Sequence, residues 1–188
     1  NKIDPTGKYG RGSGWTDDQW KRFDKIQQKA VGRMEKTASN MEAKAAKLDA
    51  KGEAGGDALR AKAGYLNAGA SALRSNGADG KIANAVTKEV YASMPGHSEG
   101  GAASVKNNGP IMTVNIGNTK AWGRNAGESS ERAAGHESLH TAGLNDQVGA
   151  NGARAYFDGR PEQLKAFEAM KGTPQADINP DHLMDEVY

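Results

Sequence analysis

The stretch HESLHTAGLND, residues 136–146, decides how the rest of the chain is read. Residues four apart lie on one face of an α-helix, so the imidazoles of His136 and His140 can point at one position. Two neutral imidazoles at that separation suit a divalent zinc ion. Glu137 lies one step around the helix, close to the metal but not bound to it, where its carboxylate can take a proton from a metal-bound water. The spacing therefore predicts a helix that carries a catalytic zinc site.

The residues after the second histidine predict the third ligand. Gly143 stands where glycine commonly ends a helix, in the left-handed conformation. A sharp turn there can bring Asp146 back to the metal as an oxygen ligand. Three protein ligands leave the fourth position open for water, which is typical of a catalytic rather than a structural zinc site. The competitors for the third position are His182 and, as weaker candidates, Asp158, Asp177 and Asp181.

The alternative interpretation of this stretch is a solvated helix with two surface histidines and a glycine cap. Small and apolar side chains favour partial burial instead; they are Ala133, Ala134, Leu139 and Ala142. Two of the four histidines in the chain also lie in this one helix. We therefore prefer the metal site. Ser129 or Ser130 is expected to cap the helix, with Glu131 in its first turn.

The eleven residues resemble the extended zinc-binding motif of the metzincin metallopeptidases, in the variant with aspartate as the third ligand. The resemblance covers the C-terminal third of the chain. It implies a zincin-like core, a zinc cofactor, and a methionine turn beneath the metal with a tyrosine that can reach the site. The chain ends HLMDEVY, residues 182–188, in which Met184 fits the turn methionine and Tyr188 the tyrosine that would donate to the oxyanion. The sequence departs from the family in one respect, because Tyr188 follows Met184 by four residues and not by two.

The opening phrase NKIDPTG, residues 1–7, resembles the end of the Rhs/YD-repeat core, after which a variable toxin domain follows directly. Taken alone, the phrase is also a common proline–glycine turn. Together with the enzyme-like motif, the resemblance implies an antibacterial effector of interbacterial competition, exported by a bacterial machine such as type VI secretion. It would act in the cytoplasm of a neighbouring cell after release from the Rhs shell, and a cognate immunity protein would protect the producer.

The length and composition indicate one domain of ordinary size with a modest hydrophobic core. The chain has 188 residues, of which 36% are hydrophobic, and its mean hydropathy is −0.77. A net charge of +2 gives no sign of nucleic-acid binding, and no apolar run approaches the ~20 residues of a membrane span. With no cysteine, disulfides and thiolate ligands are excluded. We divide the chain into an Rhs tail and linker at 1–14 and a toxin domain at 15–188, in which 15–108 is helical and 109–188 holds a strand, the zinc helix and the methionine turn.

The expected fold class is α+β, mostly helical, with a small sheet beside the active-site helix. A capping box at Thr16 and Gln19, flanked by Trp15 and Trp20, begins a long amphipathic helix that runs to about Ala50. A second helix is expected over 58–73. Apolar residues at four-residue steps favour a helix over 82–94, although alternation keeps a strand possible there.

The remaining elements surround the motif. Residues 95–108 read as a loop, in which His97 is either an exposed histidine or a contact to substrate or immunity protein. The β-branched stretch 111–116 is the best strand, and in metzincin-like enzymes the corresponding strand borders the cleft, where a peptide could add to its edge. Trp122 either walls the cleft or packs in the core. A short helix is expected from Pro161 to Gly172, and Asn179 can cap the final segment.

Three functions follow from this sequence. The first is a zinc-dependent endopeptidase in which Glu137 activates water. The second is a zinc hydrolase of a non-protein amide, such as one in the cell wall, which uses the same site chemistry. The third is a binding appendage with an inert motif.

Overall fold

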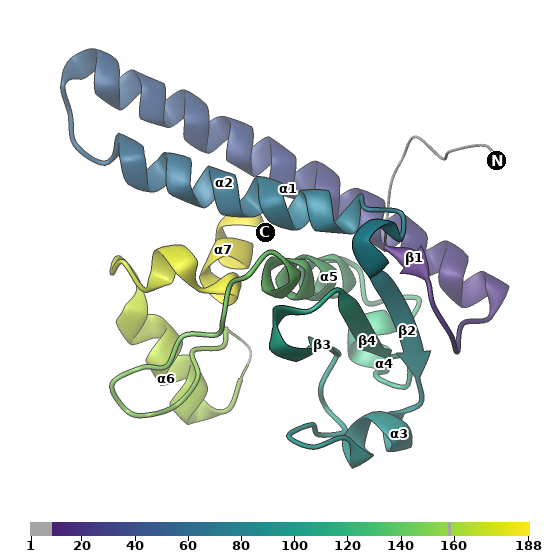
Figure 1. The fold of residues 1–188 in the computed structure, drawn as a ribbon. Helices are drawn as coiled ribbons and strands as arrows, with labels where there is room; N and C mark the ends of the chain where they lie inside the picture. The colour runs from purple at the N-terminus through teal and green to yellow at the C-terminus, as the bar shows by residue number, and fades with distance from the viewer. Residues whose placement is uncertain (1–8, 158) are drawn as a thin grey trace.

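The computed structural model describes residues 9–157 and 159–188. The fold is α+β and mostly helical, as expected, with a four-stranded mixed sheet and a long N-terminal helix (Figure 1). The opening phrase at 1–7 and the alternative ligand Asp158 lie outside the described residues. Among the described helices, none combines the length and the apolar character needed to cross a membrane.

The longest element is α1 (Asp17–Lys51), which pairs with α2 (Gly56–Leu73) in a helical hairpin. The capping box is confirmed, because the Thr16 hydroxyl accepts from the Gln19 N–H and the Gln19 side chain accepts from the Thr16 N–H. Trp15 and Trp20 contact each other edge to face, with ring centroids 5.5 Å apart. Helix α1 is about 50 Å long, and the tip of the hairpin extends beyond the rest of the molecule (Figure 1).

The sheet has the order β1-β2-β4-β3. Strands β1 (Gly10–Arg11), β2 (Ile82–Val86) and β4 (Ile111–Asn115) run parallel, and β3 (Ala103–Val105) runs antiparallel to β4. The strand expected at 111–116 is confirmed, but the expectation that its edge is open to a peptide is wrong, because β4 has a neighbour on each side. The edge strand on this side is β3, which lies in the stretch expected to be loop.

The prediction of a helix over 82–94 is also wrong for the first half of that range. Residues 82–86 form β2, and only α3 (Lys88–Ser93), capped by the Thr87 hydroxyl, is helical. The side chains that bury in β2 are Ala83 and Ala85, whereas the larger Ile82 and Val86 are half-buried. The four-residue spacing of Ile82 and Val86 therefore does not identify the buried face of this segment, which the two alanines form.

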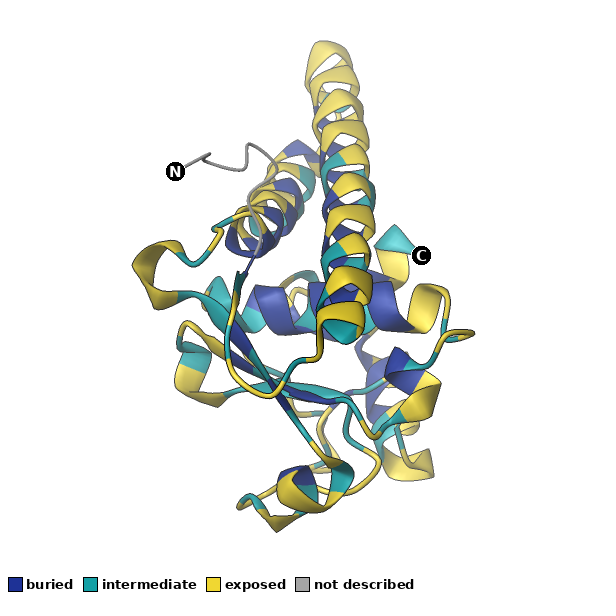
Figure 2. Cartoon of the chain, turned by 90° about the vertical axis from the view of Figure 1, so that its right-hand side faces the viewer, coloured by how far each residue is buried: buried dark blue, intermediate teal, exposed yellow. Residues whose placement is uncertain are grey.

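The core encloses α5 (Glu128–Thr141), the helix of the histidine motif. It lies between the α1–α2 hairpin on one side and the sheet on the other, with α4 (Thr119–Trp122) alongside (Figures 1 and 2). Gly69 of α2 lets the helices approach closely, since a Cβ there would lie 2.7 Å from Met34 Cε and 2.9 Å from Leu139 Cδ2. Trp122 belongs to this core, where its indole packs on Phe23.

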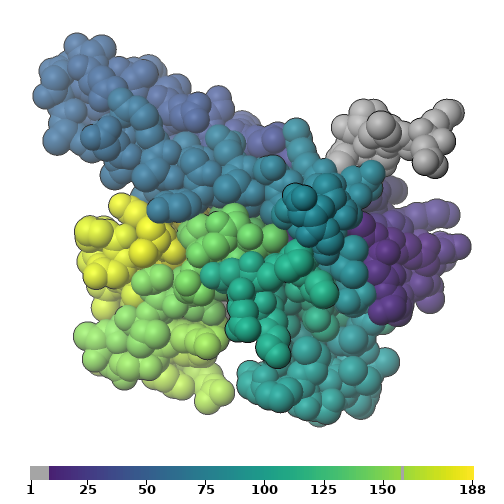
Figure 3. Space-filling view, viewed as in Figure 1, coloured from purple at the N-terminus to yellow at the C-terminus, as the bar shows by residue number. Residues whose placement is uncertain are grey.

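A second, smaller core lies under the C-terminal segments. It consists of Ala155, Ala166, Phe167, Met170 and Ala176. The segments that enclose it include α6 (Pro161–Met170), which begins at Pro161 as expected, and the 3-10 turn Ala176–Ile178. The chain then enters α7 (Pro180–Val187), which Asn179 caps as expected and which packs on α5. The surface is hollowed between the segment around α6 and the segment around α3 (Figure 3).

Candidate metal centre

Helix α5 presents both histidines of the motif on one face, near its C-terminal end. The helix begins at Glu128 after Gly127, so the cap expected from Ser129 or Ser130 is wrong; Ser130 is buried inside the helix at 2% exposure. Its other end agrees with the motif, because the helix stops at Thr141 and Gly143 takes a positive φ of 100°.

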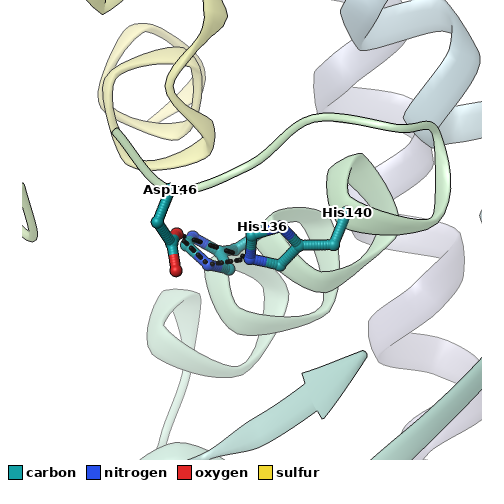
Figure 4. A group of neighbouring side chains, drawn as sticks. All are labelled: His136, His140 and Asp146. Atoms are coloured by element: carbon teal, nitrogen blue, oxygen red, sulfur yellow. Dashed lines mark hydrogen bonds and ion pairs between the residues drawn. The ribbon is translucent and has the colours of Figure 1, made fainter. Parts of the chain in front are cut away.

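Three side chains converge where the chain turns back after Gly143. Nε2 of His136 and Nε2 of His140 lie 3.0 Å apart, and Oδ1 of Asp146 lies 3.5 Å from the first and 3.4 Å from the second (Figure 4). All three ligand atoms lie within 4.8 Å of one another. Two imidazoles and one carboxylate that meet in this way could hold a metal ion.

Each imidazole has a contact at its Nδ1 atom, while its Nε2 atom faces Asp146. Nδ1 of His140 lies 2.8 Å from the carbonyl oxygen of Leu144 and can donate its hydrogen to it. Nδ1 of His136 lies 3.6 Å from Oδ2 of Asp181, at the start of α7. Protonation on Nδ1 leaves the lone pair on Nε2, which is the atom that faces Asp146 in each ring.

Asp146 is held through only one of its oxygens. Tyr156 donates its hydroxyl hydrogen to Oδ2 at 2.6 Å, and Nη1 of Arg154 lies 3.5 Å from the same oxygen. Oδ1 is buried and takes no well-aligned hydrogen bond from the described residues, although it faces both imidazoles. A buried carboxylate oxygen aimed at two imidazole nitrogens fits a metal ligand, so the residues present fit a zinc ion.

The charges of the three side chains respond to one another. Burial and the neighbouring His140 lower the pKa of His136 to about 4. Burial opposes the charged form of His140, but its 3.4 Å contact with Asp146 and the charges of Glu137 and Asp146 raise its pKa to about 9. Burial likewise opposes ionisation of Asp146, yet the two histidines and Tyr156 lower its pKa to about 2. The carboxylate of Asp146 therefore favours a positive charge on His140, and that charge in turn disfavours a second one on His136.

Glu137 follows the first histidine and lies on the side of α5 that faces the sheet. Its side chain is buried, with the residue 8% exposed, and its Oε2 has no hydrogen-bond partner among the described residues. Burial raises the pKa of Glu137 to about 7; the His140 charge and a backbone hydrogen bond from Val105 of β3 oppose that rise. A carboxyl group with a pKa near neutrality can both accept and return a proton.

Of the two C-terminal residues expected at the site, Met184 packs directly against α5. Met184 is fully buried, and a Cβ on Gly135 would lie 2.5 Å from its sulfur. Tyr188 lies elsewhere, because the Arg33 guanidinium stacks 4.7 Å over its ring. Burial raises the pKa of the Tyr188 hydroxyl, and the charge of Glu131 adds to that rise.

The competitors for the third ligand have other surroundings. Nε2 of His182 lies 3.0 Å from the Phe167 carbonyl, and its ring stacks on that of Phe167. Asp177 pairs with Lys62 at 2.9 Å. Asp181 lies behind His136, where it contacts Nδ1 and not the ligand atom. Within the described residues, the one His, Asp and Glu group that can hold a metal consists of His136, His140 and Asp146.

Two side chains at this centre were not expected from the sequence, namely Tyr156 and Arg154. Both belong to the stretch ARAYF, residues 153–157, in which Ala155 is fully buried and its two neighbours face Asp146. This alternation of small and large polar residues is the sequence signal that could have identified them. No protein-family model, curated protein or solved structure matches the chain.

Proposed function

We propose that the protein is a zinc-dependent endopeptidase. The observation that carries this proposal is that His136 and His140 of α5 meet Asp146 beside Glu137, a buried carboxyl group on the same helix. A bound zinc ion would supply a Lewis acid that polarises the scissile carbonyl and makes water more acidic.

Glu137 would act as the general base and then as the general acid. Its carboxylate accepts a proton from the attacking water and returns that proton to the leaving amine. Both steps need a group that is ionised and protonated in turn, and the burial that raises the pKa of Glu137 favours the protonated form that the second step needs. Nδ1 of His140 can donate to the Leu144 carbonyl, and Oδ2 of Asp181 faces Nδ1 of His136 at 3.6 Å.

A polypeptide substrate is supported by the edge strand next to Glu137. The Ala102 carbonyl accepts a hydrogen bond from the Asn115 N–H on β4. Backbone groups alternate in direction along a strand, so the N–H and C=O groups of Ala103 and Val105 point away from β4, toward the open edge of β3. The Val105 N–H there faces Glu137, and the Ala103 carbonyl accepts from the Tyr91 hydroxyl at 2.5 Å. A peptide that displaces these contacts can pair with β3 by main-chain hydrogen bonds.

Delivery as an Rhs-type effector with an immunity protein belongs to the same proposal and rests on the resemblance of residues 1–7 alone. If the domain acts in a bacterial cytoplasm, its expression there stops growth, and Glu137→Gln abolishes this effect.

The experiment that tests the activity compares wild type with Glu137→Gln and His136→Ala. Metal analysis comes first: we expect about one zinc per chain in wild type and Glu137→Gln, and loss of zinc in His136→Ala. Proteomes of cells that express each protein are then compared for new N-termini. New termini that require both Glu137 and His136 are the expected result.

Two other results would redirect the proposal. Zinc binding with cleavage of cell-wall peptide amides, but of no protein, would identify the non-protein hydrolase. A protein that binds no zinc and whose effect on cells is unchanged by Glu137→Gln would be a binding appendage.

A further inference from the structure

We propose that Arg154 binds a carboxylate of the substrate next to the metal centre. The inference rests on the proposed function and narrows its substrate class to polypeptides that carry a carboxylate close to the scissile bond. That carboxylate comes either from an aspartate or glutamate side chain or from the C-terminus of a short substrate.

Arg154 belongs to a rigid, strand-like segment. Val148 and Arg154 form an antiparallel bridge, and the backbone bonds Gly149 N–H to Ala153 O and Ala155 N–H to Gln147 O, both 2.9 Å, close the ladder around it. The segment is attached to the second core through Ala155, which is fully buried and whose carbonyl accepts from Asn179 at 3.3 Å. Arg154 therefore extends toward Asp146 from a fixed backbone.

The contacts of Arg154 leave most of its guanidinium available. Its Nη1 lies 3.5 Å from Oδ2 of Asp146 and 3.3 Å from the Tyr156 hydroxyl oxygen. The side chain is nevertheless 64% exposed. A guanidinium carries five N–H donors, and among the described residues these contacts use Nη1 alone.

Support of Asp146 does not by itself explain an arginine at this position. Tyr156 already donates to Oδ2 at 2.6 Å, a shorter contact than that of Arg154. A cation beside a ligand carboxylate also opposes the binding of a metal cation by simple electrostatics. Arg154 is therefore not needed to orient Asp146, and its charge does not favour metal binding. A role in binding substrate explains its position better.

Arg132 provides a contrast within the same neighbourhood. Its side chain is 15% exposed and is engaged by the Asp181 carbonyl, by Asp185 at 3.5 Å and by the Phe157 ring at 3.6 Å. Arg132 is therefore a packed structural residue. Arg154 has the exposure and the unengaged donors that recognition of a carboxylate needs, because a guanidinium binds a carboxylate through two parallel hydrogen bonds.

The test measures peptide binding to zinc-loaded Glu137→Gln, which keeps the metal ligands and cannot turn over. Three peptides of equal length are titrated by calorimetry: a neutral peptide with an amidated C-terminus, the same peptide with one internal glutamate, and the neutral peptide with a free C-terminus. We expect one carboxylate peptide to bind most tightly. Adding Arg154→Gln should weaken that peptide about tenfold or more and leave the neutral amidated peptide unchanged.

The matched control is Arg60→Gln, which removes the same charge from an arginine that pairs with Asp49 and Asp57 near the start of α2, at the tip of the hairpin. Equal effects of Arg60→Gln and Arg154→Gln, or an equal loss for neutral and carboxylate peptides, would overturn the inference. Failure of the proposed function looks different, since wild-type protein would then cleave none of these peptides whatever Arg154→Gln does to binding. Which carboxylate peptide binds best identifies the source of the charge.

Discussion

Oδ2 of Asp181 lies 3.6 Å from Nδ1 of His136, so the first turn of α7 reaches the Nδ1 side of a histidine carried by α5. A carboxylate in this position fixes the ring and its tautomer and makes Nε2 a better donor. We expect Asp181→Asn to lower zinc affinity about 10- to 100-fold, measured by competition with a chromophoric chelator. Asp185→Asn is the control, because Asp185 is more exposed and contacts Arg132 instead. Equal affinities of the two variants would refute this role of Asp181.

The two tyrosines near the C-terminal segments should differ in their effect on the metal. Tyr156 donates to Asp146, whereas the buried hydroxyl of Tyr188 has no hydrogen-bond partner among the described residues. Tyr156→Phe should therefore weaken zinc binding by about tenfold or more, and Tyr188→Phe should leave it unchanged. The same chelator competition measures both. A larger loss in Tyr188→Phe would show that the C-terminus reaches the metal in solution.

Gly135 should not tolerate a side chain, because its neighbour is Met184. A Cβ there would lie 2.5 Å from the sulfur of this fully buried methionine and 3.4 Å from that of Met34. We expect Gly135→Ala to lower the free energy of unfolding by about 1–3 kcal/mol, measured by denaturant titration. Gly32, in the middle of α1, has nothing within 4 Å of such a Cβ, so Gly32→Ala should raise it by about 0.5–1 kcal/mol. If Gly32→Ala also lowered the free energy of unfolding, helix propensity would not explain the behaviour of this control variant.

His182 should make the protein less stable in mild acid. Burial lowers its pKa below the ordinary 6.5, and the hydrogen bond to Phe167 opposes this only in part. The unfolded chain then binds this proton more readily than the folded one, so stability present above pH 6.5 is lost as the pH falls through 6.5 toward the folded pKa.

The measurement compares thermal unfolding of metal-free wild type and His182→Gln at about pH 7.5 and about pH 5.5. Glutamine can still donate to the Phe167 carbonyl but does not titrate. We expect a smaller fall in Tm for the variant, and an equal fall in both proteins would contradict the assignment.

The motif predicted which three side chains would meet, because its logic is local. His136 and His140 share a face by helix geometry, and Gly143 permits the turn that returns Asp146. Contacts that join distant segments were not predictable in the same way. Asp181 reaches His136 across 45 positions of sequence, a separation that no spacing rule covers, and it was considered only as a weak candidate ligand.

The sheet shows a second reason for error. In β2 the buried positions are alanines, so the side chains that mark the packed face carry almost no hydrophobic signal. In β3 the strand is three residues long and follows a glycine-rich stretch, which reads as loop. The long helix α1, by contrast, repeats its apolar pattern over many turns, and its bounds were predicted to within one or two residues.

The enclosure of α5 has a consequence for motion. Residues of α1, α2, β3, α4 and α7 all pack on it, and Leu139 is fully buried, whereas the distal end of the α1–α2 hairpin extends away from the body (Figure 1). Amide hydrogens of α5 should therefore be among the slowest in the protein to exchange with deuterated solvent, and those near the hairpin tip among the fastest. Fraying of the tip would then leave the spacing of the two imidazoles intact, so that this centre is lost only when the whole domain unfolds.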